Sequence, residues 1–599
     1  MHRSVSRLPL LLFLALSGQG LSRLKAVDLD VQRISAEPAP VGESISFMVA
    51  AAAEGDPVID FQFSVAPPGE PFTVVRDFAH YSDRFDWAPM QEGWHALRVS
   101  ARDASTGEVA SKEVSFEAVS RIGHDQRPVI SSVGHPLVFL YSAPACDFGF
   151  ITVQFAKVGS MEGWSSTSPQ YCDGFKSHNF WIAGLEPTSD YHVKYVIWDY
   201  EAGTEKEGPE LTFRTGEIAV PLPTGSVMQV GAGRLDAGEG ILLQSSLDMA
   251  GTNPAGTPFA HKLDGTVVWY HDKAARGKLQ YILRPLAGGG MFGLPTGEVP
   301  GGLRWTDLAG NLVWETNAEA ISARMKALGY PEIGKFHHDA LLLPSGSILA
   351  LASRDAALPG AKLGDPLVNG DVLVLLDRNC EVLWVWDAFE KLDVNRKATL
   401  GDRNVSPPGS GLPPTEDWTH GNSLDYLPDG DILFSMRSQD WVIRIDFRDG
   451  RGTGDVIWRL GKDGDFTLES NDPWGWFSHQ HHPHYDGTRL WIYDNGNTRF
   501  QAAGRTGNSR GQVYVLDETA MTARLELNAD LGVYSSALGS AQRLSNGNYS
   551  FESGSVYLDR RTVSQTLEVS PDGVVRHGYQ VNLGVYRSFR MHDLYRAPQ

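Results

Sequence analysis

The sequence predicts an all-β protein in which a six-bladed β-propeller follows one or two small β-sandwich domains. Three observations lead to this fold class. The 599 residues include 63 Gly, 34 Pro and 16 Trp, which favours many short strands and turns over helices. Short runs alternate between apolar and polar residues. In the second part of the chain, a turn-and-strand unit recurs.

The first residues are typical of an export signal. Arg3 and Arg7 form a basic start, an apolar run extends from Leu8 to Leu16, and small or polar residues follow at 17–20. An uncleaved membrane anchor is the less favoured alternative, because the apolar run is short for a span of about 20 residues. We therefore expect residues 1–20 to be a signal peptide and the protein to be exported, periplasmic or secreted, without stable membrane insertion.

Two small modules are expected next. Residues 27–120 contain strand-like alternations at 45–49, 61–65 and 95–100, as in a β-sandwich. In residues 128–216, the run from Gly184 to Tyr195 resembles the corner of fibronectin type III domains, where a Leu and a Pro precede a Tyr that enters the next strand. Such modules serve surface or carbohydrate contact, or else packing or dimerisation, so a homodimer is compatible with the sequence.

The cysteines number three, Cys146, Cys172 and Cys380. In an exported protein, an odd count leaves at least one free thiol. Cys146 and Cys172 flank one short segment and could pair. No Cys-His zinc spacing accompanies them.

Residues 225–599 carry the repeat. Its first signal is a turn that begins with Asp and leads into an apolar run, often with Trp. The leading aspartates are 43, 70, 69, 71 and 55 residues apart, and they are Asp264, Asp307, Asp377, Asp446, Asp517 and Asp572. A second turn signal alternates with the first, so each unit holds two hairpins. Two hairpins make a four-stranded blade, and six units make a six-bladed propeller, which accounts for the near-equal spacings better than a solenoid or a large sandwich.

Three hairpins of the repeat region have a histidine near the start of the first strand. They begin near His338, His420 and the pair His481-His482, and Arg354 and Arg437 follow the second strands of the first two. Together these side chains form a donor-rich, cationic centre in a chain of formal charge −20. Such a centre suits a tetrahedral oxyanion such as sulfate or phosphate. Adjacent residues of a strand face opposite ways, so only one of His337 and His338, and one of His481 and His482, should point into the channel.

Several ordered motifs of residues 225–599 resemble the bacterial arylsulfotransferase family. They are Phe-His-His-Asp at 336–339, Trp-Thr-His-Gly-Asn-Ser at 418–423, Ser-Met-Arg-Ser-Gln-Asp-Trp at 435–441, His-Gln-His-His at 479–482 and Asp-Asn-Gly-Asn-Thr-Arg at 494–499. The resemblance implies a six-bladed propeller behind an N-terminal β domain. It also implies transfer of a sulfuryl group from an aryl sulfate to a phenol without a nucleotide donor, with His420 at the position of the family's nucleophile.

This resemblance assigns a role to each candidate residue. His420 would form a sulfohistidine intermediate in a ping-pong reaction, and His338 would protonate the leaving phenoxide and later deprotonate the acceptor. Arg354 and His481 would hold the sulfuryl oxygens, while Asn422 and Arg437 orient them or His420. No cofactor or metal is expected. His261 and His271 are candidates for a further active-site histidine of the family, but their surroundings match poorly.

Two other function classes stay open. His479, His481, His482 and His484 could ligate a metal, and the tryptophans at the blade turns are reminiscent of quinone-dependent propellers. The third class is a non-catalytic, secreted propeller that binds ligands through its face. A general nucleic-acid binder is disfavoured by the charge of −20.

Overall fold

The structure, a computed structural model, confirms the all-β prediction. It describes residues 27–53, 57–80, 83–228, 238–247, 256–272, 279–295, 299, 301–358, 360, 365–401, 403–404 and 415–598. Within these ranges there are 45 strands and three short α-helices, α1 (Ala318–Ala327), α2 (Ala388–Lys391) and α3 (Asn497–Ala502). The predicted signal peptide, residues 1–20, lies outside the described residues. None of the described helices has the length and apolar character needed to cross a bilayer.

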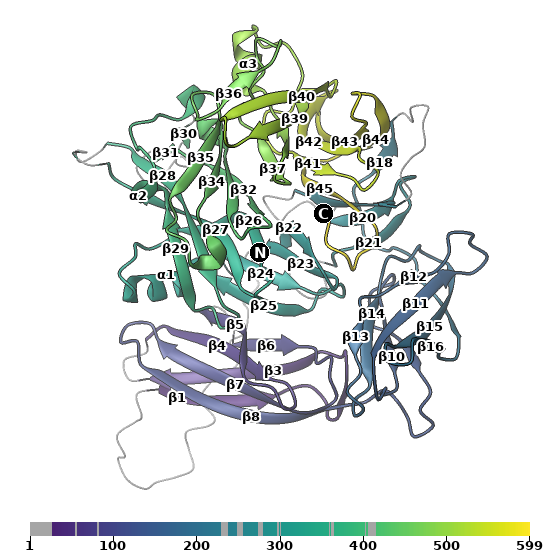
Figure 1. The fold of residues 1–599 in the computed structure, drawn as a ribbon. Helices are drawn as coiled ribbons and strands as arrows, with labels where there is room; N and C mark the ends of the chain where they lie inside the picture. The colour runs from purple at the N-terminus through teal and green to yellow at the C-terminus, as the bar shows by residue number, and fades with distance from the viewer. Residues whose placement is uncertain are drawn as a thin grey trace, which may run out of the picture.

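The first module is a pair of facing sheets (Figure 1). One sheet has the order β1 (Val27–Arg33), β3 (Ile45–Ala53), β6 (Arg84–Trp87). The other has the order β2 (Ala39–Pro40), β8 (Val109–Val119), β7 (Gly93–Asp103), β4 (Ile59–Ala66), β5 (Thr73–Ala79). Apolar residues at every second position of these strands, such as Phe47 and Phe63, are fully buried between the sheets.

The second module also consists of two sheets. One has the order β14 (His178–Ile182), β10 (Phe139–Ala143), β9 (Val129–Ser132). The other has β11 (Phe150–Lys157) and β15 (Asp190–Asp199) at its centre and β12 (Ser165–Ser166), β13 (Gln170–Tyr171), β16 (Thr204–Glu207) and β17 (Leu211–Arg214) at its edges. The Tyr191 hydroxyl accepts a hydrogen bond from the Glu186 N–H at 2.8 Å. This contact is the corner that the run from Gly184 to Tyr195 predicted.

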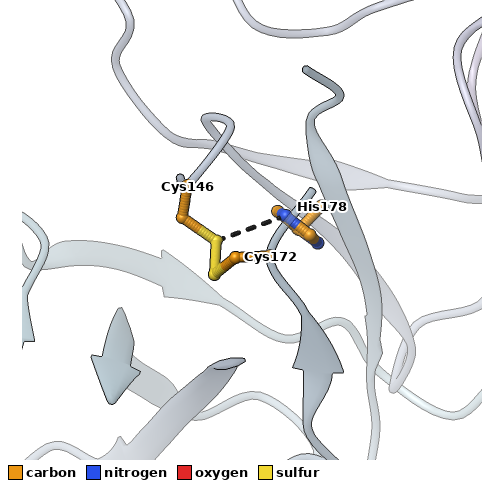
Figure 2. Close-up of side chains that lie close together, drawn as sticks. All are labelled: Cys146, Cys172 and His178. Carbon is orange, nitrogen blue, oxygen red and sulfur yellow. Dashed lines mark hydrogen bonds between the residues drawn. A yellow bond between two sulfur atoms is a disulfide. The ribbon is translucent and has the colours of Figure 1, made fainter. Parts of the chain in front are cut away.

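Cys146 and Cys172 form a disulfide within the second module, and Cys380 is free and buried (Figure 2). The cross-link ties the segment after β10 to the segment after β13. It therefore closes a loop of 26 residues whose ends would otherwise be held only by short strands.

The second half of the described chain contains six groups of four antiparallel strands. The last strand of the protein, β45 (Val585–Met591), pairs with β19 (Ile241–Ser246) and completes the first group with β20 (Phe259–Lys262) and β21 (Val267–Tyr270). The second and third groups are β22 (Leu279–Leu286), β23 (Gly290–Pro295), β24 (Gly302–Thr306), β25 (Leu312–Asn317), and β26 (Lys335–Leu342), β27 (Ile348–Ala356), β28 (Leu367–Leu376), β29 (Val382–Asp387).

The remaining three groups follow in chain order. They are β32 (Gly421–Tyr426), β33 (Ile432–Met436), β34 (Trp441–Ile445), β35 (Val456–Gly461); β37 (His481–Tyr485), β38 (Arg489–Asp494), β39 (Arg510–Asp517), β40 (Thr522–Asp530); and β41 (Ser540–Arg543), β42 (Tyr549–Leu558), β43 (Arg561–Val569), β44 (Val575–Val581). Short strands β18 (Gly225–Val227), β30 (Arg403–Asn404), β31 (Thr415–Asp417) and β36 (Thr467–Glu469) add to their edges.

One strand of each group contacts its counterparts in the two neighbouring groups. The contacts run from β22 to β26, β32, β37, β41, β45 and back to β22. Figure 1 shows these strands gathered toward the middle of the six sheets. Residues at their starts are thereby brought together even though they lie far apart in the sequence.

The N-terminal modules pack directly on the repeat region. Strand β5 pairs in parallel with β25 through Arg76 and Glu315. The buried Asp77 carboxylate of β5 accepts hydrogen bonds from Arg324 at 2.8 and 2.9 Å and from Thr316 at 2.8 Å. The second module shares a hydrophobic core with the first and second strand groups. Of the roles expected for the modules, these contacts support packing against the repeat region.

A buried charge cluster lies where three of the inner strands meet. Asp339 of β26 is 1% exposed and accepts hydrogen bonds from Arg284 of β22 at 3.0 and 2.8 Å and from Arg587 of β45 at 3.1 Å. The Leu424 N–H of β32 donates to it at 2.9 Å. Burial alone would raise the pKa of Asp339, but the two guanidinium groups more than offset this and lower it to about 2.

The Asp339 cluster yields a test of stability. Asp339→Asn keeps the side-chain size but leaves two buried guanidinium groups without their counter-charge. We expect the free energy of unfolding to fall by about 3–5 kcal/mol, measured by urea unfolding. Asp190→Asn is the matched control, because Asp190 pairs with Arg214 at the surface, where such pairs contribute about 0–1 kcal/mol. Equal losses in both variants would contradict the central role of Asp339.

Candidate active site

His338 and His420 face each other at the starts of neighbouring inner strands. Their ring centroids are 4.9 Å apart and the ring planes are inclined by 62°. Both residues have positive φ, 55° and 46°. This left-handed conformation is uncommon for residues other than Gly. The irregularity in β26 lies between Phe336 and Ala340 and contains His338, so this bulge turns His338 out of the regular strand pattern. His420 directly precedes β32, which has its own register shift between Gly421 and Ser423.

The His420 ring is held by a carboxylate at the end of the preceding strand, β31. Its Nδ1 lies 2.5 Å from Oδ2 of Asp417, and Asp417 is buried. A carboxylate accepts, so Nδ1 carries the hydrogen and the lone pair stays on Nε2. The His420 side chain is 29% exposed, and Nε2 has no hydrogen-bond partner in the part of the chain that the structure describes. This nitrogen is therefore available to a ligand.

Gly421 is required beside His420 for a steric reason. A Cβ at this position would lie 2.4 Å from the Phe434 ring and 2.8 Å from Oδ2 of Asp371. The Gly421 N–H donates to that same oxygen at 2.5 Å. The close approach fixes the backbone directly after His420.

His338 is half-buried and contacts His337. Nδ1 of His338 lies 2.7 Å from Nδ1 of His337, and the Tyr586 hydroxyl donates to the His338 carbonyl at 2.5 Å. Burial, and next the neighbouring His337 and His420, lower the pKa of His338 well below its ordinary value. His338 is therefore neutral when no ligand is bound.

The rings of His337 and His338 meet, although alternation in a strand predicted that they face opposite ways. That rule holds for extended backbone. The positive φ of His338 breaks the alternation and brings the two ring nitrogens within hydrogen-bonding distance.

His481, rather than His482, lies near His338 and His420. Nδ1 of His481 is 2.6 Å from Oδ1 of Asn495. Burial, then the charge of Arg437, lower the pKa of His481 well below its ordinary value, and His420 adds to the effect. His482 instead contacts the Ala541 carbonyl at 3.2 Å and the His484 ring. His481 thus faces the same region as His420 and Arg437.

Arg437 and Asn422 lie on either side of His420. The Arg437 backbone N–H donates to the His420 carbonyl at 3.1 Å, and its guanidinium donates to the Ser536 carbonyl at 3.4 Å. Asn422 is 1% exposed, and its side chain donates to the Gln480 carbonyl at 2.7 Å. Asn422 therefore connects β32 to the segment before β37.

Arg354 is held away from the histidines by a different partner. Its Nε and a terminal nitrogen contact Oδ2 of Asp387 at 2.8 and 2.7 Å, and the guanidinium lies 4.4 Å from the centre of the Phe389 ring. Among the described residues, no contact joins it to His338, His420 or His481. Arg354 would have to leave Asp387 to reach a ligand at these histidines.

Sequence reasoning missed several residues of the site: Asp417, His337, Asp371, Tyr586 and Arg587. Asp417 could have been found, because it precedes His420 by three residues within the same motif. Asp371 and Arg587 carry no local signal, since they lie 49 residues before and 167 residues after His420 in the sequence.

His261 lies elsewhere. It is fully buried in β20, where its Nδ1 contacts the Lys262 carbonyl at 2.7 Å and its ring lies 4.1 Å from that of Tyr579. Burial lowers its pKa to about 4. These contacts are those of a structural histidine on the first strand group.

Potential metal ligands gather at one place in the described residues. Ligand atoms of Cys146, Cys172 and His178 lie within 4.8 Å of one another (Figure 2). Both sulfurs belong to the disulfide, so they offer no thiolate for a metal. The four histidines at 479–484 do not form such a group: His479 lies 3.1 Å from Asp440, and His484 lies 3.0 Å from Asp425.

Comparisons with known proteins agree with the sequence resemblance. A family model described as Arylsulfotransferase (ASST) matches residues 236–585. No curated protein matches. Among the solved structures that match is the crystal structure of chicken CNTN1 FN1-FN3 domains, with 9% identity, a TM-score of 0.13 and coverage of 30% of this chain. This chain spans 62% of that structure's length, and the low TM-score carries no conclusion about fold. The family match covers more than half of the chain and includes His338, His420 and His481, so this protein belongs to the arylsulfotransferase (ASST) family.

Proposed function

We propose that this protein transfers a sulfuryl group from an aryl sulfate to a phenol through a sulfohistidine at His420, without a nucleotide donor. The observation that carries the proposal is the His420 ring: Asp417 holds Nδ1, Nε2 is free, and His338 lies opposite at 4.9 Å between ring centroids. Family membership supports arylsulfotransferase activity in general. The residue roles are those that the family resemblance implies, and the contacts of His420 and His338 support them.

In the first half-reaction, Nε2 of His420 attacks the sulfur of the aryl sulfate. The N–S bond forms, the S–O bond to the aryl group breaks, and the phenoxide departs. A phenol has a pKa of about 10, so the phenoxide leaves more readily when an acid protonates it. His338 is the acid because it faces His420 from the neighbouring strand.

In the second half-reaction, an acceptor phenol attacks the sulfur of sulfohistidine. His338 takes the phenol proton, the new S–O bond forms, and the N–S bond breaks. The enzyme regains its starting protonation state, so the reaction is ping-pong and consumes no net proton.

The sulfuryl oxygens need hydrogen-bond donors. His481 and Arg437 are suitable donors. The charges of Arg437 and His420 act on the His481 ring, and the Arg437 N–H donates to the His420 carbonyl. The family resemblance also assigns Arg354 to this role, which requires the substrate to draw its guanidinium away from Asp387. Asn422 orients the strand that carries His420. The reaction as written uses protein side chains only and requires no metal or cofactor.

We further infer that the six strand groups are the blades of a six-bladed β-propeller spanning residues 225–599, behind β-sandwich modules at 27–120 and 128–216. The ring of inner-strand contacts and the pairing of β45 with β19 support this architecture. In a propeller the inner strands line a central channel, which would put the His420 site at the channel mouth. The second module would be of the fibronectin type III kind.

We also propose export to a periplasm or the outside of the cell, on the basis of residues 1–20. The partners of the protein would be small-molecule aryl sulfates and phenols rather than nucleic acid. A homodimer formed through the N-terminal modules is compatible with this function.

The first activity test addresses the nucleophile. Loss of a catalytic nucleophile can cost on the order of 10⁶ in kcat, whereas a general acid contributes about 10²–10⁴. We expect His420→Asn to fall to background with para-nitrophenyl sulfate and His338→Asn to retain measurable turnover. With donor alone, the intact mass of the wild-type protein should rise by one sulfuryl group, and peptide mapping should find it between Trp418 and Ser423. An adduct on another histidine would show that the roles are wrongly assigned.

The second test addresses Asp417. Asp417→Asn removes the carboxylate that fixes the tautomer of His420; in a serine-protease triad the corresponding change costs about 10⁴ in kcat. We expect a loss of about 10²–10⁴ for every donor, whatever the acidity of its phenol, since the nucleophile itself is affected. Asp190→Asn is the surface control. A loss confined to donors with poorly acidic phenols would indicate that Asp417 serves proton transfer instead.

The third test separates this function from a metal-dependent one. Prolonged dialysis against a chelator should leave turnover of para-nitrophenyl sulfate unchanged, because imidazole and guanidinium groups supply the positive charge. Loss of turnover that a single metal restores would favour the metalloenzyme alternative.

A further inference from the structure

Behind His338, away from His420, lies a chain of titratable groups. Nδ1 of His338 is 2.7 Å from Nδ1 of His337, and Nε2 of His337 is 3.2 Å from Oδ1 of Asp371. The two histidines belong to β26 and Asp371 to β28 of the same strand group. His337 is 8% exposed and Asp371 1%, so the chain is shielded from water.

Asp371 requires a positive partner. It is a buried carboxylate, and an unpaired charge in such a place is strongly unfavourable. Its Oδ2 accepts the Gly421 N–H at 2.5 Å, which is a neutral donor. Within the described residues, His337 is the only group capable of positive charge that contacts it. Nε2 of His337 faces Oδ1 of Asp371 at 3.2 Å, and the two groups carry opposite charges when His337 holds a proton on both nitrogens.

We propose that His337, held as a cation by Asp371, stores the proton that His338 passes to the departing phenoxide. The inference rests on the proposed function, because it concerns the acid of that reaction. His337 acts through His338 and not on the substrate, so it is a positioning residue that also carries the proton.

The proton balance follows from which nitrogen holds each hydrogen. In the resting site, Nδ1–H of cationic His337 donates to Nδ1 of His338, which carries its own hydrogen on Nε2. When the S–O bond breaks, the phenoxide takes the Nε2 hydrogen of His338, and the Nδ1 hydrogen of His337 moves to Nδ1 of His338. His337 becomes neutral and keeps Nε2–H toward Asp371. In the second half-reaction each hydrogen moves back as the acceptor phenol gives up its proton.

This arrangement accounts for how His338 can act as an acid at all. Burial and the nearby His337 and His420 lower the pKa of His338 well below its ordinary value, and His481 and Arg587 add to the effect. A second proton on His338 itself is therefore disfavoured. With the proton stored one ring away, His338 can donate from Nε2 without becoming a cation.

The experiment compares two donors in wild-type protein and in variants of His337, Asp371 and His577. In para-nitrophenyl sulfate the phenoxide leaves without protonation, whereas in phenyl sulfate it needs the acid. For His337→Gln we expect sulfohistidine formation within a few-fold of wild type with the first donor and a loss of about 10²–10⁴ with the second. Asp371→Asn should give the same pattern more weakly. His577→Gln is the matched control, since His577 is a buried histidine of the outer strand β44, and it should leave both rates unchanged.

The double variant tests whether the two histidines act as one unit. If His337 works only through His338, the variant His337→Gln with His338→Asn should be no slower with phenyl sulfate than His338→Asn alone. Multiplied losses, or equal losses with both donors in His337→Gln, would overturn the relay and leave His337 a structural residue.

The outcome for wild-type protein separates this inference from the proposed function. If wild type forms no sulfohistidine at His420 with para-nitrophenyl sulfate, the proposed function fails. If wild type and His337→Gln both form it, and both keep the same preference between the two donors, only the relay fails. A His337→Gln protein that forms the adduct normally with para-nitrophenyl sulfate is also shown to be folded.

Discussion

The arrangement of the site depends on one buried carboxylate. Asp339 gathers two guanidinium groups and two backbone N–H groups from strands β22, β45, β32 and its own β26. It immediately follows His338, so the charges that bind it also fix the peptide on which His338 stands. Arg587 donates as well to the Asn422 carbonyl at 2.6 Å, two residues beyond His420. The two facing histidines are thus held by a single charge cluster, and a shift of one strand would move both.

The same cluster sets the electrostatics of the site. The chain has a formal charge of −20, yet beside the carboxylate of Asp417 the site contains the imidazoles of His338 and His481 and the guanidinium of Arg437. The positive charge of Arg587 contributes to lowering the pKa of His338 and of His481. Neutral imidazoles keep a lone pair for attack and an N–H for donation, while the nearby arginines favour an anionic ligand. Under the proposed function, these arginines would attract the anionic aryl sulfate to a site in an otherwise acidic protein.

The hairpins and the central histidines were predictable from the sequence, because strands and turns are determined mainly by neighbouring residues. Turn residues at regular spacing predicted the hairpins, and a histidine at the start of three of them predicted a shared centre around His338, His420 and His481. What could not be predicted depends on backbone conformation or distant partners. The positive φ of His338 turns its ring onto His337, against the alternation rule. The hold of Asp387 on Arg354 and the approach of Asp371 to Gly421 join segments that no pattern in the sequence connects.

Two carboxylates lie beside the histidines, Asp417 and Asp371. Asp371 contacts both the His337 ring and the backbone next to His420. The Asp417 carboxylate holds Nδ1 of the His420 ring, which leaves Nε2 without a hydrogen-bond partner among the described residues. Asp371 contacts the His337 ring with one oxygen and the backbone after His420 with the other. Asp371 therefore joins the strand that carries His337 to the backbone directly after His420, so one buried side chain fixes these two segments relative to each other. Under the proposed reaction, this shared anchor would hold the acid and the nucleophile beside the same substrate, which matters most for donors whose phenoxide needs a proton to leave.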